Sequence, residues 1–596
     1  MKAHHKLILF LLLFTALFSG VKAESYERYN FYDWNVSVSS GFWDSYGATN
    51  VDAGDLDKVK NEIYQQYLTN ISSRKTELQS GSITIGNTTM KFSMERIGFP
   101  GKNGFPVYIA LRGGGVGDAA VADEQYENMK WYYRGAITSG IYIVPYGVSV
   151  SYDEHYRPES FQFYDRFIRD AVAFYNADPN KVYLLGFSSG GDGVYEVSPH
   201  IADLFAAVNM SAGYPSVRSL GNLYNLPFCV QMGQYDTAYD RNVLAARYHL
   251  WLNEEQEKYG GGFPHETFIH VDGDHNSWID YSNRSQPVIV AEDIGKWLSG
   301  SSDYRTENRN TNAVKWVHNY QRDPLPKKLV WETFIYAGFR DTRAFYWLDR
   351  DGNLNDVTVL AKYFPDKNTV MIDFIGEPDG TLKIYLKPEM LDVYNDVTIK
   401  IAGKSVRVKP IVSKQVMKDT LYARGDLNYM FTSEIDIQFD RKAKTASVKS
   451  VGAGKKDYAV KGRDHLFYWN DDGVLFVEKD LFGITFSELK SKLPELHLPE
   501  PEKWPYWGKD LSWTYWDDEN NRTVVFMFQH GKTVLIYGEY EGSVDDSFKA
   551  AAEKVYRKTD GELRCGTTCR YYLESNPYDN KDHIQQKFIY YLYEEY

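Results

Sequence analysis

Five short, continuous apolar segments follow one another in the first half of the chain, and sequence with helical character lies between them. The segments are residues 107–111, 141–144, 182–185, 205–208 and 228–232. Apolar runs of this length without polar alternation are typical of strands buried on both faces of a parallel sheet. Residues 161–176 have the apolar spacing of a helix, and parallel strands need such connections. The pattern predicts the α/β class.

The first 23 residues have the pattern of a secretory signal. Lys2 and Lys6 precede an apolar run over residues 7–18, and small residues end the segment at Ala23. The run is shorter than a membrane span, so we expect cleavage and no stable membrane insertion afterwards; the alternative is an uncleaved anchor. The predicted location is secreted or extracellular, or periplasmic in a bacterium.

Six Asn-x-Ser/Thr triplets would make the chain a glycoprotein in a eukaryotic secretory pathway. They begin at Asn35, Asn70, Asn87, Asn209, Asn283 and Asn521. Asn209 ends an apolar run, and we expect it to be too buried for modification.

The formal net charge of −13 argues against a nucleic-acid partner, because phosphate binding needs a basic face.

The pattern of apolar and polar residues changes after residue 300. The polar stretch 301–312 is typical of a linker. The β-rich pattern of residues 325–450 predicts a β-sandwich-like domain. Within that domain, Glu377-Pro-Asp-Gly380 predicts a hairpin between strands 369–374 and 382–386. A second hairpin is predicted between strands 397–401 and 406–408.

The pattern of residues 451–596 predicts a small α+β module of unknown type. Its expected strands are 467–469, 474–477, 524–528 and 533–537, and its expected helix is 547–557. Cys565 and Cys569 have no histidine nearby, which disfavours a zinc site.

A G-x-S-x-G pentapeptide, residues 186–190, directly follows the third apolar segment. A strand, a sharp turn carrying serine and then a helix form a nucleophile elbow, in which glycines permit the turn and expose the hydroxyl. The pattern predicts Ser188 as a nucleophile. The alternative is an ordinary strand–helix loop in which Ser188 caps the helix.

A serine nucleophile needs a base, and on this scaffold the chain order is serine, acid, histidine. Asp236 follows the fifth apolar segment and is the predicted acid, with Asp240 as its competitor. His275 is the predicted base, in a turn that we expect to precede a helix. His265 and His270 fit a structural role.

A glycine run, residues 113–115, follows the first strand. Backbone amides at such a loop can stabilise the oxyanion of a tetrahedral intermediate. The predicted donors are Gly113, Gly114 and Ser189. The alternative for the run is a flexible loop without a role.

Several stretches carry a resemblance to a known family. FPVYIALRGGG, ADEQYENM and DPNKVYLLGFSSGGDGVYEVSPHIADLFAAVNMSAGYP resemble secreted α/β-hydrolases of the esterase branch, which includes polyhydroxybutyrate depolymerases and feruloyl or acetylxylan esterases. GQYDTAYDRN and RDPLPKKLVWE look like a multidomain subfamily with a C-terminal β domain. The resemblance implies an α/β-hydrolase catalytic domain over residues 24–300 and the same triad.

One position departs from the family pattern. Arg112 stands where the family has the histidine that props the oxyanion loop. Arg112 can be solvated, bind a local acid, or pair with a carboxylate of the substrate.

These features predict a secreted serine hydrolase that cleaves carboxylic esters, either small or polymer-linked, through an acyl-enzyme. Neither a metal nor another cofactor is needed. Two alternatives stay open: a serine peptidase on the same triad, and a non-catalytic binding or surface protein in which Arg112 marks a relic site.

Overall fold

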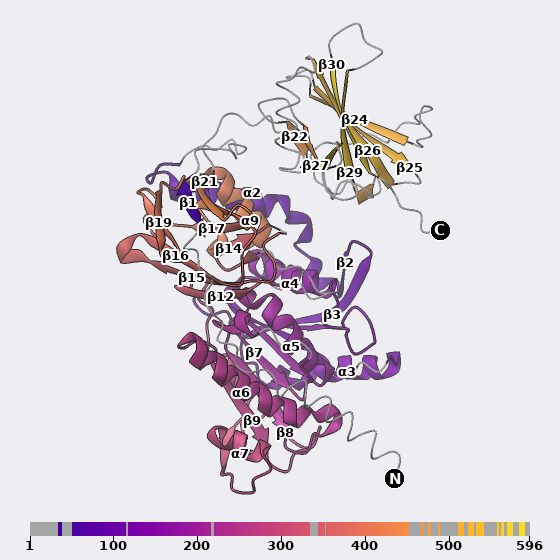
Figure 1. Ribbon diagram of the computed structural model, residues 1–596. Coiled ribbons are helices and arrows are strands. Elements are labelled where there is room, and N and C mark those ends of the chain that lie inside the picture. Colours follow the sequence, from indigo (N-terminus) through magenta and orange to yellow (C-terminus); the bar gives the residue numbers. More distant parts are fainter. Residues whose placement is uncertain are drawn as a thin grey trace, which may run out of the picture. The chain divides into compact units, whose positions relative to one another are not determined.

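The computed structural model divides the chain into two compact units (Figure 1). The first comprises residues 1–42 and 49–452, and the second comprises residues 43–48 and 453–596. In the first unit the structure describes residues 34–38, 51–114, 117–215, 220–333, 344–351 and 353–451. In the second it describes residues 467–469, 475–477, 487–488, 511–517, 522–529, 532–541, 557–559, 562–564, 569–575 and 583–590.

A ten-stranded mixed sheet forms the centre of the first unit. Its order is β11-β10-β9-β8-β7-β6-β4-β5-β3-β2. The strands are β2 (Ser82–Ile85), β3 (Thr88–Ile97), β4 (Phe105–Leu111), β5 (Gly140–Pro145), β6 (Ala177–Phe187), β7 (Ala207–Ser211), β8 (Phe228–Gly233), β9 (His265–His270), β10 (Ser285–Ile289) and β11 (Thr306–Asn310). Strands β4 to β9 pair only in parallel with one another.

The five apolar segments form β4 to β8, which confirms the α/β class. The fourth strand begins two residues later than its apolar segment, at Ala207. The interpretation of residues 301–312 as a linker is wrong at β11, which pairs antiparallel with β10. This segment is polar because it is an exposed edge strand.

Helices cover both faces of this sheet, and the alternation of side chains along β4 separates the two layers. Val107, Ile109 and Leu111 join a core that includes residues of α4, α5 and α6. Tyr108 and Ala110 join a second core with α3 and α8. The helices are α2 (Leu56–Asn70), α3 (Ala119–Tyr132), α4 (Ser160–Phe174), α5 (Ser189–His200), α6 (Arg241–Tyr259), α7 (Ile294–Leu298), α8 (Ala313–Val317) and α9 (Lys414–Arg424).

Two smaller sheets follow in the same unit. One has the order β1-β21-β20-β17-β14-β13, and the other has the order β12-β15-β16-β18-β19. Phe374 from one and Phe439 from the other meet edge to face, so the two sheets share a core. Their strands are β1 (Asn35–Val38), β12 (Lys328–Glu332), β13 (Ala344–Phe345), β14 (Leu348–Arg350), β15 (Thr358–Phe364), β16 (Thr369–Ile375), β17 (Gly380–Leu386), β18 (Val397–Ile401), β19 (Lys404–Val408), β20 (Ser433–Asp440) and β21 (Thr445–Val451).

The two predicted hairpins have different outcomes. The second is confirmed, because β18 and β19 pair antiparallel with Ile401 opposite Lys404. The first is wrong, because β16 and β17 belong to different sheets and pair with other strands. The turn between them therefore carries the chain from one sheet to the other.

The small sheets share one hydrophobic core with α4, α5 and α6. Along β12, the Glu332 backbone N–H donates to Asn222 and the Asn222 amide donates to the Glu332 carbonyl. The Asn225 amide donates to the Lys328 carbonyl. Strands β12 to β21 therefore pack against a face of the α/β layer within the same compact unit.

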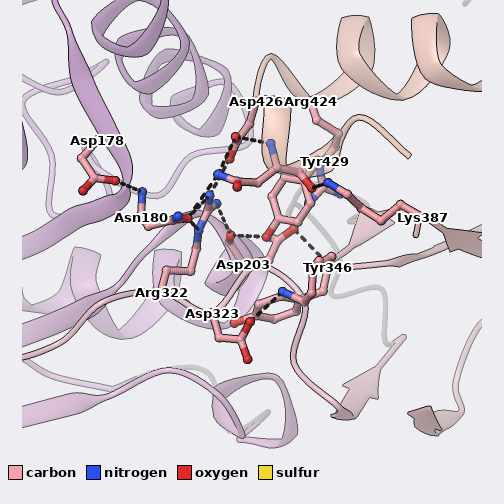
Figure 2. Close-up of polar contacts among 12 residues, drawn as sticks. Asp178, Asn180, Asp203, Arg322, Asp323, Tyr346, Lys387, Arg424, Asp426 and Tyr429 are labelled. Atoms are coloured by element: carbon pink, nitrogen blue, oxygen red, sulfur yellow. Dashed lines mark hydrogen bonds and ion pairs between the residues drawn. The ribbon is translucent and has the colours of Figure 1, made fainter. Parts of the chain in front are cut away.

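A buried group of charged side chains joins the same two regions (Figure 2). Arg322 donates to the Asn180 side chain and to the Asp203 carbonyl, and it pairs with Asp426. Arg424 pairs with the Asp203 carboxylate, and the Tyr429 hydroxyl donates to the Asp203 carbonyl. Removing one partner of a buried ion pair is costly, so a change at any of these residues should disturb the contact between the two regions.

Replacing Arg322 with alanine is expected to destabilise the first unit by about 3–5 kcal/mol, because it strips a buried acid of its partner. Urea denaturation followed by circular dichroism measures this loss. Arg441→Ala is the matched control, since Arg441 pairs with Asp379 at the surface and the two side chains are 52% and 47% exposed. An equal shift in both variants would contradict the assigned role of the buried network.

The second unit contains a seven-stranded sheet of order β24-β25-β26-β30-β29-β28-β27 and a two-stranded sheet, β22-β23. The strands are β22 (Phe467–Trp469), β23 (Leu475–Val477), β24 (Leu511–Asp517), β25 (Arg522–Gln529), β26 (Lys532–Glu541), β27 (Arg557–Thr559), β28 (Glu562–Arg564), β29 (Cys569–Ser575) and β30 (His583–Tyr590). The four predicted strands are present. The predicted helix lies outside the described residues except for Arg557, which begins β27.

The predicted signal, Asn521 and Cys565 also lie outside the described residues. Asn209 is fully buried, as expected. Among the described helices, none is both long and apolar enough to cross a bilayer.

Candidate active site

The turn between β6 and α5 has the strained geometry of a nucleophile elbow. Ser188 has φ 57° and ψ −123°, a region that residues with a side chain rarely adopt. Gly186 and Gly190 make the turn possible, because a Cβ on Gly186 would lie 2.1 Å from the Gly190 carbonyl oxygen. A Cβ on Gly190 would lie equally close to the Leu111 carbonyl oxygen. The Ser188 backbone N–H donates to the Ser211 carbonyl, which fastens the elbow to the end of β7.

The three residues predicted as a triad come together at the carboxyl ends of β6, β8 and β9. His275 Nε2 lies 3.0 Å from Ser188 Oγ, and His275 Nδ1 lies 2.7 Å from Asp236 Oδ2. The Asp236 side chain is buried, and 27% of the His275 side chain is exposed. A buried carboxylate on one ring nitrogen and a hydroxyl on the other orient an imidazole for proton transfer.

A residue that sequence reasoning did not single out completes the acid's surroundings. Arg241, at the start of α6, donates to Asp236 Oδ1 from Nη2 at 2.7 Å and from Nε at 3.1 Å. The second carboxylate oxygen is thus left for His275. The acid and the arginine are five residues apart in the sequence. That spacing alone does not predict an ion pair, because the loop geometry decides whether the two side chains meet.

The competing residues lie elsewhere. Asp240 is exposed in the left-handed region at the start of α6. His270 stacks on Trp278 and contacts Gln231, and His265 contacts the Phe263 carbonyl. The helix expected after His275 is not formed, because the loop runs directly into β10.

The predicted oxyanion loop lies against the elbow. A Cβ on Gly113 would lie 3.2 Å from Ser188 Cβ, so the loop backbone approaches the nucleophile as closely as glycine allows. Within the described residues, no hydrogen bond uses the backbone N–H groups of Gly113, Gly114 or Ser189. These three amides are therefore available to a ligand.

Arg112 is fully buried beneath this loop. Its guanidinium donates to the Tyr146 carbonyl at 2.7 Å and to the Gly113 carbonyl at 2.9 Å, and it packs over the Tyr146 ring. Glu154 Oε1 lies 3.2 Å from Arg112 Nη1. Of the three expectations for Arg112, binding a local acid is the one observed, and a buried side chain cannot pair with a carboxylate of a substrate.

Glu154 is a second residue that sequence reasoning missed. Burial raises the pKa of its carboxyl to about 7, although Arg112 and the Ser189 hydroxyl oppose that shift. The signal that could have found it is Arg112 itself, since a buried arginine requires an acid, but the partner lies 42 residues away.

Aromatic rings flank the Ser188–His275 pair. Phe187 lies 5.5 Å from the His275 ring and 6.0 Å from Trp278, between ring centroids. Tyr132 packs against Phe187 and Tyr281. The surroundings of the pair are thus apolar on this side. In the described part of the chain, no group of three or more His, Cys, Asp or Glu is placed to hold a metal.

No family model matches the chain, and no curated protein matches it. Among solved structures, a thermostable esterase is 15% identical over 41% of this chain and 64% of its own, with a TM-score of 0.27. The BES protein from Bacillus cereus is 12% identical over 36% of this chain and 92% of its own, with a TM-score of 0.25. A poly(3-hydroxybutyrate) depolymerase from Bordetella parapertussis is 13% identical over 39% of this chain and 88% of its own, with a TM-score of 0.26. At these TM-scores the similarity does not support an inference about activity.

Proposed function

We propose that this chain is a serine hydrolase of the α/β-hydrolase type that cleaves carboxylic esters. The observation that carries the proposal is the pair of hydrogen bonds linking Ser188 Oγ, His275 and Asp236, at 3.0 and 2.7 Å. Of the described groups, only this serine combines a partly exposed elbow position with a base held by a buried acid.

The reaction follows from these contacts. His275 Nε2 takes the proton of Ser188 as Oγ attacks the ester carbonyl, and the oxyanion forms beside the amides of Gly113, Gly114 and Ser189. His275 then gives its proton to the departing alcohol, which leaves an acyl-enzyme on Ser188. Water, deprotonated by the same imidazole, releases the acid and restores the hydroxyl.

The surroundings of Arg112 argue against a relic site. Its buried guanidinium holds the loop backbone rather than blocking it, and the three amides have no partner among the described residues. A loop with this arrangement retains what ester hydrolysis requires.

The predicted signal over residues 1–23 leads us to propose export of the mature protein.

A fluorophosphonate probe tests the proposal. The wild-type chain is expected to be labelled covalently at Ser188, and Ser188→Ala is expected to show no labelling above background. Equal labelling of both proteins, measured by intact mass, would overturn the proposal.

A panel of aryl acetates, feruloyl esters and dipeptide amides then measures selectivity. We expect turnover of the esters only. Faster cleavage of the amides would favour a serine peptidase on the same triad. A wild-type chain that labels no better than Ser188→Ala would instead leave the non-catalytic protein with a relic site.

A further inference from the structure

We propose that Glu154 is a positioning residue that holds both halves of the oxyanion hole with one carboxylate oxygen. The inference rests on the proposed function, and it names what aligns the oxyanion donors of that site. Glu154 lies between β5 and α4, outside the elbow, the glycine loop and the triad.

The contacts of one atom, Glu154 Oε1, carry the inference. It accepts from Ser189 Oγ at 2.8 Å and from Arg112 Nη1 at 3.2 Å. Ser189 supplies one predicted donor amide, and Arg112 directly precedes the glycines that supply the others. Glu154, Arg112 and Ser189 are all buried, so their bonds are shielded from water and strengthened. A shift of the loop relative to the elbow would stretch one of the two bonds.

The loop itself is oriented by its carbonyls. The Arg112 carbonyl accepts from His155 Nε2 at 3.0 Å, and the Gly113 carbonyl accepts from Arg112 Nη1 at 2.9 Å. In a trans peptide the carbonyl and the following N–H point in opposite directions. Fastening these two carbonyls to buried groups therefore turns the N–H groups of Gly113 and Gly114 away from them. Glu154 is the acid among the groups that hold the guanidinium where it reaches the Gly113 carbonyl, and the Tyr146 carbonyl is another of these groups.

His155 contributes as a neutral donor. Burial, together with the charge of Arg112, lowers the pKa of its imidazole to about 3, so the ring is uncharged near neutrality. Within the described residues its Nδ1 has no hydrogen-bond partner, which places the proton on Nε2, facing the Arg112 carbonyl. The remaining cationic group in this cluster is Arg112, and Glu154 is the acid that pairs with it.

Glu154→Gln tests the inference while keeping the size of the side chain. We expect kcat for an aryl ester to fall about 100-fold with little change in KM, because oxyanion donors act on the transition state more than on the bound ester. Ser189→Ala, which removes only the hydroxyl, is expected to lower kcat about tenfold. The double variant should match Glu154→Gln alone, because both changes break the same connection.

Each kcat is divided by the concentration of active sites found by fluorophosphonate titration, so that misfolded protein does not count. Glu95→Gln is the control, because Glu95 pairs with Arg134 at the surface and is expected to leave kcat unchanged. A merely structural role for Glu154 would lower the urea midpoint and leave kcat per titrated site within threefold of wild type, and this result would overturn the inference.

Ser189→Ala keeps the test decisive if Glu154→Gln does not fold, since an unchanged kcat in that variant contradicts the coupling. A wild-type chain that neither labels nor turns over esters would overturn the proposed function and the inference together. A wild type that does both, with both variants unaffected, overturns the inference alone.

Discussion

Replacing His275 with alanine is expected to lower kcat for an aryl ester by about a million-fold, while KM changes little. Without the imidazole that lies 3.0 Å from Ser188 Oγ, nothing accepts the serine proton as the carbonyl is attacked. Asp236→Asn should cost about 10⁴-fold, since an amide that donates to Nδ1 favours the wrong imidazole tautomer. Steady-state kinetics on purified variants measure both effects.

Asp240→Asn is the matched control for Asp236→Asn. Asp240 has φ 56°, a conformation that asparagine adopts as readily as aspartate, so the backbone should be undisturbed. We expect its kcat to stay within about twofold of wild type, because Asp240 is not bonded to His275. A loss as large as that of Asp236→Asn would show that the acid has been wrongly assigned.

A chain that ends at residue 300 is expected not to fold, whereas one that ends at residue 451 should fold and hydrolyse esters. The shorter chain lacks β12 to β21, whose apolar side chains share a single core with α4, α5 and α6. It also lacks Arg322 and Arg424, the partners of the buried Asp203. Each large side chain missing from a core costs about 2–5 kcal/mol, and domains are stable by only about 5–15 kcal/mol, so the deficit exceeds the stability.

Both truncated chains should begin at residue 24 and be compared by soluble yield, circular dichroism and urea denaturation. Cooperative unfolding of the 24–300 chain, with kcat near that of the full chain, would show that residues 325–451 are an accessory to a self-sufficient catalytic layer. The boundary predicted near residue 300 would then be a true folding boundary.

The parts that could be predicted are those in which the chemistry is local. The apolar runs of β4 to β8 predicted the sheet because strands buried on both faces leave no polar residues in the run. Ser188, Asp236 and His275 could be chosen because each follows its own strand, and strand ends meet at one edge of a parallel sheet.

Pairings between distant segments could not be predicted. Turn residues near Gly380 showed where the chain reverses, but the same turn can join neighbours in one sheet or cross between two, as β16 and β17 do. Arg241 and Glu154 were missed for a related reason, since an ion pair leaves no periodic trace in the sequence. The polar strand β11 was hidden because an edge strand need not be apolar.

The first described strand of the chain also has a consequence for its synthesis. β1 runs parallel to β21, with Asn35 opposite Thr445, so its partner is made about 400 residues later. At about 5–20 residues per second, a ribosome needs roughly 20–80 s to cover that distance. Throughout this interval β1 lacks its partner strand, and once α4 and α5 have been made their face stays uncovered until β12 and the strands after it follow. Intermediates that expose apolar surface and unpaired strands are prone to aggregate, so the yield of native protein should fall as its concentration during synthesis rises.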